Sequence, residues 1–183
     1  MRTLILFSVL FFSTISFAQT TGSKYTFKEV GWTIILPSDF NAIKSVANSV
    51  NIESNRANNV RPATKNLISA FKDNNYFIAD ISLLDNTHGN DHNEVSQRAF
   101  VESYKSLKNA SMKVDSSTST ILLNGVSFKK YQLAVIENDK ILYNMLTLTK
   151  FYKGYDFYIN YMYFDEKTKV EIESMLRNSK FEK

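Results

Sequence analysis

The first strongly patterned part of the chain contains two short alternating segments. Residues 25–30 alternate apolar and polar side chains, and residues 32–36 continue a period of two until Pro37. A period of two is typical of a strand that buries one face, so we predict two strands paired about Gly31. After Pro37 the spacing becomes helical. A short amphipathic helix is predicted there from Ile43, Val46, Ala47 and Val50.

A hairpin and a second helix are predicted in the middle of the chain. Apolar segments at 67–71 and 76–84 flank residues 72–75, whose aspartate and asparagines favour a turn. Further on, residues 94–108 carry an apolar set with helical spacing, and Asp91 or Asn93 is available as the N-cap. The members of that set are Val95, Ala99, Tyr104 and Leu107.

The C-terminal third carries the clearest strand pattern. Four apolar runs lie at 119–123, 126–136, 141–152 and 155–164, separated by Asn124-Gly125, residues 137–140 and Lys153-Gly154. Asn-Gly is the strongest two-residue hairpin signal. We predict a four-strand meander and then a helix capped by Asp165. The predicted fold class is α+β, an antiparallel β-sheet with helices packed on its faces, in which the C-terminal four-strand meander is followed by a helix.

Aromatic residues are the one compositional excess, at 14% of the chain, and many of them lie in the last predicted strand. Alternation places Tyr155, Phe157, Ile159, Tyr161 and Tyr163 on one face and Asp156, Tyr158, Asn160, Met162 and Phe164 on the other. The first face is typical of a covered core surface. A ligand-binding surface is the alternative. Tyr158 and Tyr152 are the candidates for it, because they share a face with polar side chains.

The N-terminus has the organisation of a secretory signal peptide. Arg2 precedes an apolar run at 4–12, and Ser16-Phe17-Ala18 supplies a small-x-small cleavage site. We expect cleavage between Ala18 and Gln19, which gives a signal peptide at 1–18, a flexible leader at 19–24 and a single domain at 25–183. The apolar run is too short to span a bilayer, so no transmembrane segment is expected after cleavage. The predicted location is the periplasm or the extracellular medium.

Composition narrows the classes of function. The formal net charge is +4 without a block of like charges, which argues against nucleic-acid binding. No cysteine is present, so a thiol nucleophile is excluded. Ser96 and Ser127 lack the surroundings of an activated serine, and carboxylates such as Asp73 and Asp80 are expected on solvated surface. No catalytic residue and no cofactor is assigned.

Two histidines form the only candidate metal site in the sequence. His88 and His92 lie four residues apart, and Asp91 is a candidate third ligand, with Asp85 and Glu94 as alternatives. On a helix this spacing would place both imidazoles on one side, where they could bind zinc. Gly89 and Asn90 between them disfavour a helix, and a solvated loop explains the same residues.

Three segments resemble the PsbP/DcrB-like superfamily of small exported bacterial proteins, many of them from Bacteroidetes-type bacteria. They are Gly-Trp-Thr-Ile-Ile-Leu-Pro-Ser-Asp-Phe at 31–40, Asn-Gly-Val-Ser-Phe at 124–128 and Ser-Met-Leu-Arg-Asn-Ser-Lys-Phe at 174–181. The resemblance implies a sheet sandwiched by helices, in proteins that mostly bind, scaffold or assist envelope components, and it supplies no catalytic residue. The leading hypothesis is a non-enzymatic module that binds an envelope protein or a small ligand. The alternative is a metal-assisted hydrolase that uses the His88 and His92 loop.

Overall fold

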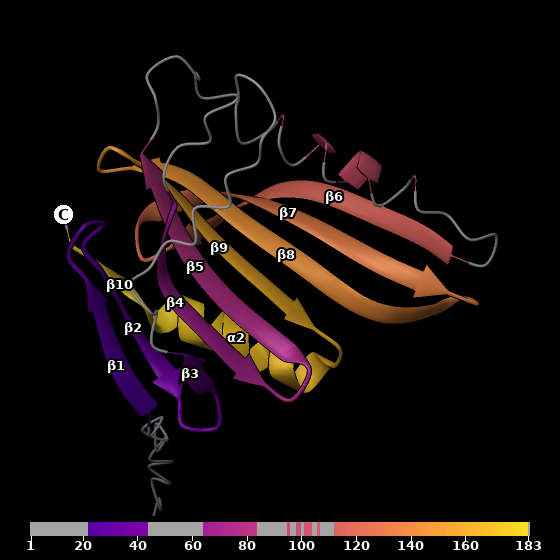
Figure 1. The fold of residues 1–183 in the computed structure, drawn as a ribbon, viewed down its shortest axis with the longest axis horizontal. Helices are drawn as coiled ribbons and strands as arrows, with labels where there is room; N and C mark the ends of the chain where they lie inside the picture. The colour runs from indigo at the N-terminus through magenta and orange to yellow at the C-terminus, as the bar shows by residue number, and fades with distance from the viewer. Residues whose placement is uncertain are drawn as a thin grey trace, which may run out of the picture.

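A computed structural model of the chain describes residues 22–43, 64–83 and 112–182, and also residues 95, 98–99, 101–103 and 106. The described strands form two antiparallel sheets, one of three strands and one of seven, and the helix α2 (Glu166–Asn178) lies with the small sheet at one side of the large one (Figure 1). The sequence-predicted α+β class is confirmed at this level.

The small sheet contains the predicted N-terminal hairpin. β1 (Gly22–Phe27) pairs with β2 (Trp32–Pro37), and β10 (Lys180–Phe181) adds a short third strand on the other side of β2. Gly31 takes φ 57° in the turn, a left-handed conformation that favours glycine. β1 begins earlier than predicted. Residues 22–24, assigned from the sequence to a flexible leader, belong to this strand because they pair with β2 as far as Pro37.

The large sheet combines the middle hairpin with the C-terminal strands in the order β3-β4-β5-β9-β8-β7-β6. Its strands are β3 (Asn41–Ile43), β4 (Thr64–Lys72), β5 (Asn75–Leu83), β6 (Met112–Leu123), β7 (Val126–Glu137), β8 (Lys140–Tyr152) and β9 (Tyr155–Tyr163). The four strands predicted at 119–164 are consecutive neighbours in the sheet. They do not form a sheet of their own, because residues 155–162 of β9 also pair with β5.

Three boundaries differ from the sequence prediction. Ile43, expected to begin a helix, instead lies in β3 opposite Ser69 of β4, because a free sheet edge offers this segment backbone partners that the helical spacing did not indicate. The rest of that predicted helix lies outside the described residues. β6 begins at Met112 rather than at 119. The turn between β7 and β8 consists of two residues, Asn138 and Asp139, both with positive φ.

α2 is the described helix that covers the large sheet. Asp165 caps it as predicted: its Oδ1 accepts a hydrogen bond from the Thr168 backbone nitrogen at 2.8 Å. The buried face of α2 consists of Thr168, Ile172, Met175 and Leu176. In the predicted 94–108 helix, the described residues 95, 98–99, 101–103 and 106 are helical, but Val95 and Ala99 of its expected apolar face are exposed.

The core lies between the α2 side of the large sheet and the small sheet. Trp32 of β2 is fully buried there, with its ring 5.2 Å from that of Phe157 and 5.5 Å from that of Phe27. The predicted core face of β9 is confirmed, since Phe157, Ile159, Tyr161 and Tyr163 all belong to the buried cluster. Alternation therefore directs the polar residues of β9 to the opposite face of the sheet. Within the described residues, no helix is long and apolar enough to cross a membrane.

Candidate functional site

The residues singled out from the sequence as metal ligands lie outside the described part of the chain. This applies to His88, Asp91 and His92, and equally to the expected cleavage residues Ala18 and Gln19. Within the described residues, no group of three or more His, Cys, Asp or Glu side chains is placed to hold a metal ion. The metal site therefore stays a prediction.

A different group of polar side chains comes together on the large sheet, on the face opposite to α2. Strand register places Asn66 of β4 opposite Asp80 of β5, Asp80 opposite Tyr158 of β9, and Tyr158 opposite Thr149 of β8. The adjacent cross-strand rows add further polar residues. We call this set the polar cluster; its members are Asn66, Ser69, Asp80, Ser82, Tyr131, Thr147, Thr149, Asp156, Tyr158 and Asn160.

Asn66 organises the β4 side of the polar cluster. Its Nδ2 donates to Asp80 Oδ1 at 2.8 Å and, at 3.4 Å, to the backbone oxygen of Ile68, and its Oδ1 accepts from Ser69 Oγ at 3.2 Å. The pairing of β4 with β5 shifts register between Asn66 and Ile68. Such a bulge redirects a side chain locally, and here the amide of Asn66 lies beside the carboxyl of Asp80. The amide thus holds that carboxyl in a fixed position.

The β9 side of the polar cluster is equally linked. Thr147 Oγ1 donates to Asn160 Oδ1 at 2.8 Å, and the Tyr158 hydroxyl donates to Asp156 Oδ2 at 3.4 Å. Asp156 and Thr149 are almost fully buried, at 2% and 3% exposure, whereas Asp80, Tyr158 and Asn160 are half-buried. Buried polar groups are tolerated where they are hydrogen-bonded. The cluster is therefore an ordered network whose central residues are half-buried.

Burial changes the acidity of the cluster. It raises the pKa of Asp80 above the ordinary value of 3.8, against the opposing effect of the hydrogen bond from Asn66. Burial, followed by the nearby charge of Asp156, raises the pKa of Tyr158 to about 12. The Tyr158 hydroxyl therefore keeps its proton at neutral pH, and Asp80 is a carboxyl whose charged form is disfavoured by its surroundings.

Tyr131 contributes a polar group with no partner. It lies on β7 opposite Thr147, on the same face as the polar cluster, and is 8% exposed. Its hydroxyl has no hydrogen-bond partner in the protein. Among the described residues, one other buried side-chain polar atom also lacks a partner, namely Trp32 Nε1 in the aromatic core. A buried hydroxyl without a protein partner costs free energy, so the Tyr131 hydroxyl does not stabilise the fold through a protein hydrogen bond.

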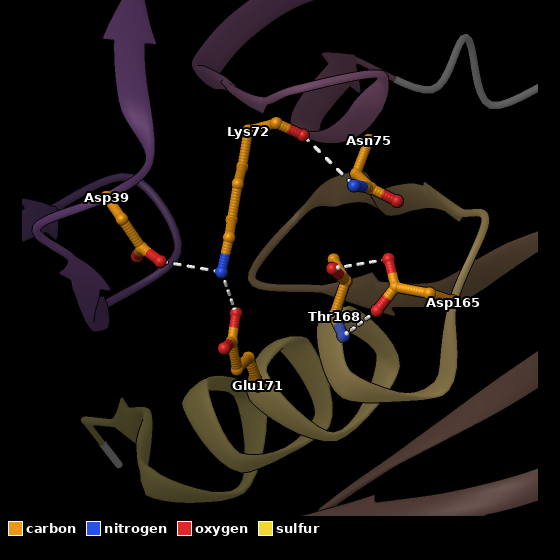
Figure 2. Close-up of polar contacts among 6 residues, drawn as sticks. All are labelled: Asp39, Lys72, Asn75, Asp165, Thr168 and Glu171. Atoms are coloured by element: carbon orange, nitrogen blue, oxygen red, sulfur yellow. Dashed lines mark hydrogen bonds and ion pairs between the residues drawn. The ribbon is translucent and has the colours of Figure 1, made fainter.

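A second polar group, on the α2 side, joins three elements (Figure 2). The Lys72 ammonium of β4 pairs with Asp39, at 2.6 Å, in the segment after β2, and with Glu171 of α2. The hydrogen bonds that Lys72 donates, first to Asp39 and then to Glu171, raise the pKa of Lys72. Asn75 Nδ2 donates a hydrogen bond to the Lys72 backbone oxygen at 3.0 Å. All the charges here have partners, so we interpret this group as a structural connection rather than a site.

The sequence contained part of the signal for the polar cluster. The alternation of β9 already placed Asp156, Tyr158 and Asn160 on one face, and Tyr158 was a candidate for binding. Asp80, expected on solvated surface, is half-buried beside Asn66, because β5 lies third from one edge of the large sheet and has neighbours on both sides. Tyr152, the other candidate, lies elsewhere, with its hydroxyl donating to the Glu182 backbone oxygen and its ring against Phe181.

No family model and no curated protein sequence matches the chain, but solved structures do. Cyanobacterial PsbP (CyanoP) from Synechocystis sp. PCC 6803 superposes with a TM-score of 0.58 at 8% identity, over 91% of this chain and 96% of that one. A Bacteroides thetaiotaomicron VPI-5482 crystal structure gives 0.50 at 11% identity, over 88% of this chain and 49% of that one. LpqN, described as involved in cell envelope biogenesis of Mycobacterium tuberculosis, gives 0.44 at 14% identity, over 91% and 88%. The first two similarities concern the fold alone, and by them this chain has the PsbP-like fold that its sequence resemblance predicted.

Proposed function

We propose that this chain is an exported, non-enzymatic module that binds a small ligand or a partner protein, and that the polar cluster is its binding surface. The observation that carries the proposal is the hydrogen-bonded network built around Asn66, Asp80 and Asn160 on one face of the sheet. A sheet face that served only to pack would be stabilised by apolar side chains, because burying polar groups is unfavourable unless every one is paired.

The geometry favours binding over packing for a further reason. Binding surfaces use a few polar groups that are held in position by their neighbours, so that little ordering is needed when a ligand arrives. Asn66 has such neighbours, and Asp80 is held by it. The export part of the proposal rests on the N-terminal segment, with its apolar run and the Ser16-Phe17-Ala18 site.

Native mass spectrometry of the protein taken from the envelope fraction of its own host tests the proposal. We expect a bound small molecule or a stoichiometric partner on the wild-type protein, and its loss in Asn160→Leu, which removes the amide but keeps the side-chain size. Asn178→Leu, on the exposed surface of α2, is the matched control and keeps the adduct. A wild-type protein with neither adduct nor partner contradicts the proposal.

The alternative function is a metal-assisted hydrolase that uses His88 and His92. It makes a separate prediction: zinc bound to the purified protein, and turnover of esterase, phosphatase, glycosidase or peptidase substrates that is lost in the double variant His88→Ala and His92→Ala. Turnover with that dependence would replace the binding proposal.

A further inference from the structure

We infer that the polar cluster binds a small, uncharged ligand with several hydroxyl groups, of the chemical class of sugars and polyols. This inference rests on the proposed function and names the ligand class for the same surface. It follows from the hydrogen-bonding groups that the network leaves unused, from their positions on the sheet, and from the mixture of donors and acceptors among them.

The unused groups can be identified one by one. Asn66 is fully engaged, with its amide nitrogen and its amide oxygen both hydrogen-bonded. Asp80 uses Oδ1 for Asn66, and its Oδ2 has no hydrogen bond among the described residues. Asn160 uses Oδ1 for Thr147, and its Nδ2 has none in the same part of the chain. The Tyr131 hydroxyl is unpaired as well. The network thus leaves unpaired an acceptor, a donor and, at the buried Tyr131 hydroxyl, a group that can do both.

These groups lie close together on the face. Asp80 is directly opposite Tyr158, and Asn160 is two residues from Tyr158 on the same strand, so Asp80 and Asn160 are diagonal neighbours about 7–8 Å apart at their backbones. Tyr131 is one strand beyond Thr147, the residue opposite Asn160. Asp80, Asn160 and Tyr131 therefore extend from β5 to β7, which are three strand spacings apart, a distance of about 14 Å. A ligand that reaches all three needs hydroxyl groups distributed along its length.

The mixture of hydrogen-bond donors and acceptors in the polar cluster argues against a charged ligand. A cation would suit Asp80 but would face the N–H groups of Asn160. An anion would suit Asn160 but would face the carboxyls of Asp80 and Asp156. A hydroxyl group both donates and accepts, so it satisfies an acceptor and a donor together. Tyr158 lies opposite Asp80 and two residues from Asn160, and its half-buried ring offers an apolar surface for the C–H face of such a ligand. The raised pKa of Asp80 is consistent with a site that does not hold a permanent positive charge.

The test uses an array of neutral mono- to tetrasaccharides, followed by calorimetry on the sugars that bind. We expect binding of at least one neutral sugar, weakened at least tenfold by Tyr131→Phe and by Asn160→Leu, with Asn178→Leu unchanged. Tyr131→Phe is the decisive variant. Its hydroxyl has no partner in the free protein, so removing it leaves the melting temperature unchanged or higher while sugar binding falls.

The outcomes separate this inference from the proposed function. No binding to any neutral sugar, or undiminished binding by Tyr131→Phe, overturns the inference. Parallel titrations with spermidine, choline and inorganic phosphate show whether the surface prefers a charged ligand. Binding of one of these that Asn160→Leu abolishes overturns the polyol class but keeps the binding function. If the native protein also carries no adduct or partner, both fail.

Discussion

Replacing Gly125 with valine tests the physical basis of the β6–β7 hairpin. Asn124 and Gly125 form a two-residue turn with φ values of 46° and 84°, between the paired residues Leu123 and Val126. Both values are positive, as a primed hairpin turn requires. A β-branched side chain resists this conformation, so valine should destabilise the protein.

The structure fixes the size of the effect. A Cβ at position 125 would meet no heavy atom within 4 Å, so steric overlap with neighbouring residues adds nothing. The cost is then that of a left-handed conformation, about 1–2 kcal/mol. For a chain of 183 residues this corresponds to a fall of roughly 2–8 °C in melting temperature. Disturbing the turn would also strain the 3.1 Å hydrogen bond from Asn124 Nδ2 to the Ser179 backbone oxygen.

Urea unfolding followed by tryptophan fluorescence is a suitable assay, because Trp32 is the single tryptophan and is fully buried. We expect a lower midpoint for Gly125→Val with an unchanged dependence on urea concentration. Gly125→Asn is the control, since asparagine tolerates positive φ, and it should lose clearly less stability. Equal losses for valine and asparagine would refute the backbone explanation. A loss above about 4 kcal/mol would do so too, because it exceeds the cost of about 1–2 kcal/mol for a left-handed conformation.

Three further predictions concern charge and processing. Asp80→Asn should be more stable than the wild type at pH 7. Burial raises the pKa of Asp80 in the folded protein, so wild-type stability falls as pH rises from about 3.8 to that raised pKa and is constant above it. Urea unfolding from pH 4 to 8 should show a stability difference that grows with pH and then levels off, and a difference that is constant over the whole range would count against it. Lys72→Met should lower the free energy of unfolding by about 1 kcal/mol in low salt and by less in 1 M NaCl, because the carboxylate partners of Lys72 lie near the surface. A loss of stability that does not depend on salt would contradict an ionic origin. The intact mass of envelope-derived protein should correspond to a chain beginning at Gln19, and a mass that includes Met1 would disprove the cleavage site.

The local sequence pattern was sufficient to predict the elements whose structure depends on burial of one face or on the residues of a turn. β9 alternates because one of its faces packs in the core, and its sequence shows this directly. Asn124-Gly125 and Lys153-Gly154 identify turns because few residues adopt positive φ at low cost. The cap at Asp165 follows from the same kind of local chemistry. The hairpins, the last helix and the fold class were therefore predictable from the sequence.

Only the tertiary structure decided which distant strands became neighbours. β5 and β9 pair across more than seventy residues of sequence, and neither strand carries a local signal for the other. That pairing brings Asp80 beside Tyr158, half-buries a carboxyl expected in solvent, and assembles the polar cluster from β4, β5, β7, β8 and β9. The β3 segment likewise became a strand at the sheet edge against its helical spacing. Hydrophobic periodicity records whether a face is buried, but a polar face acquires its chemistry from residues that only the folded sheet brings into contact.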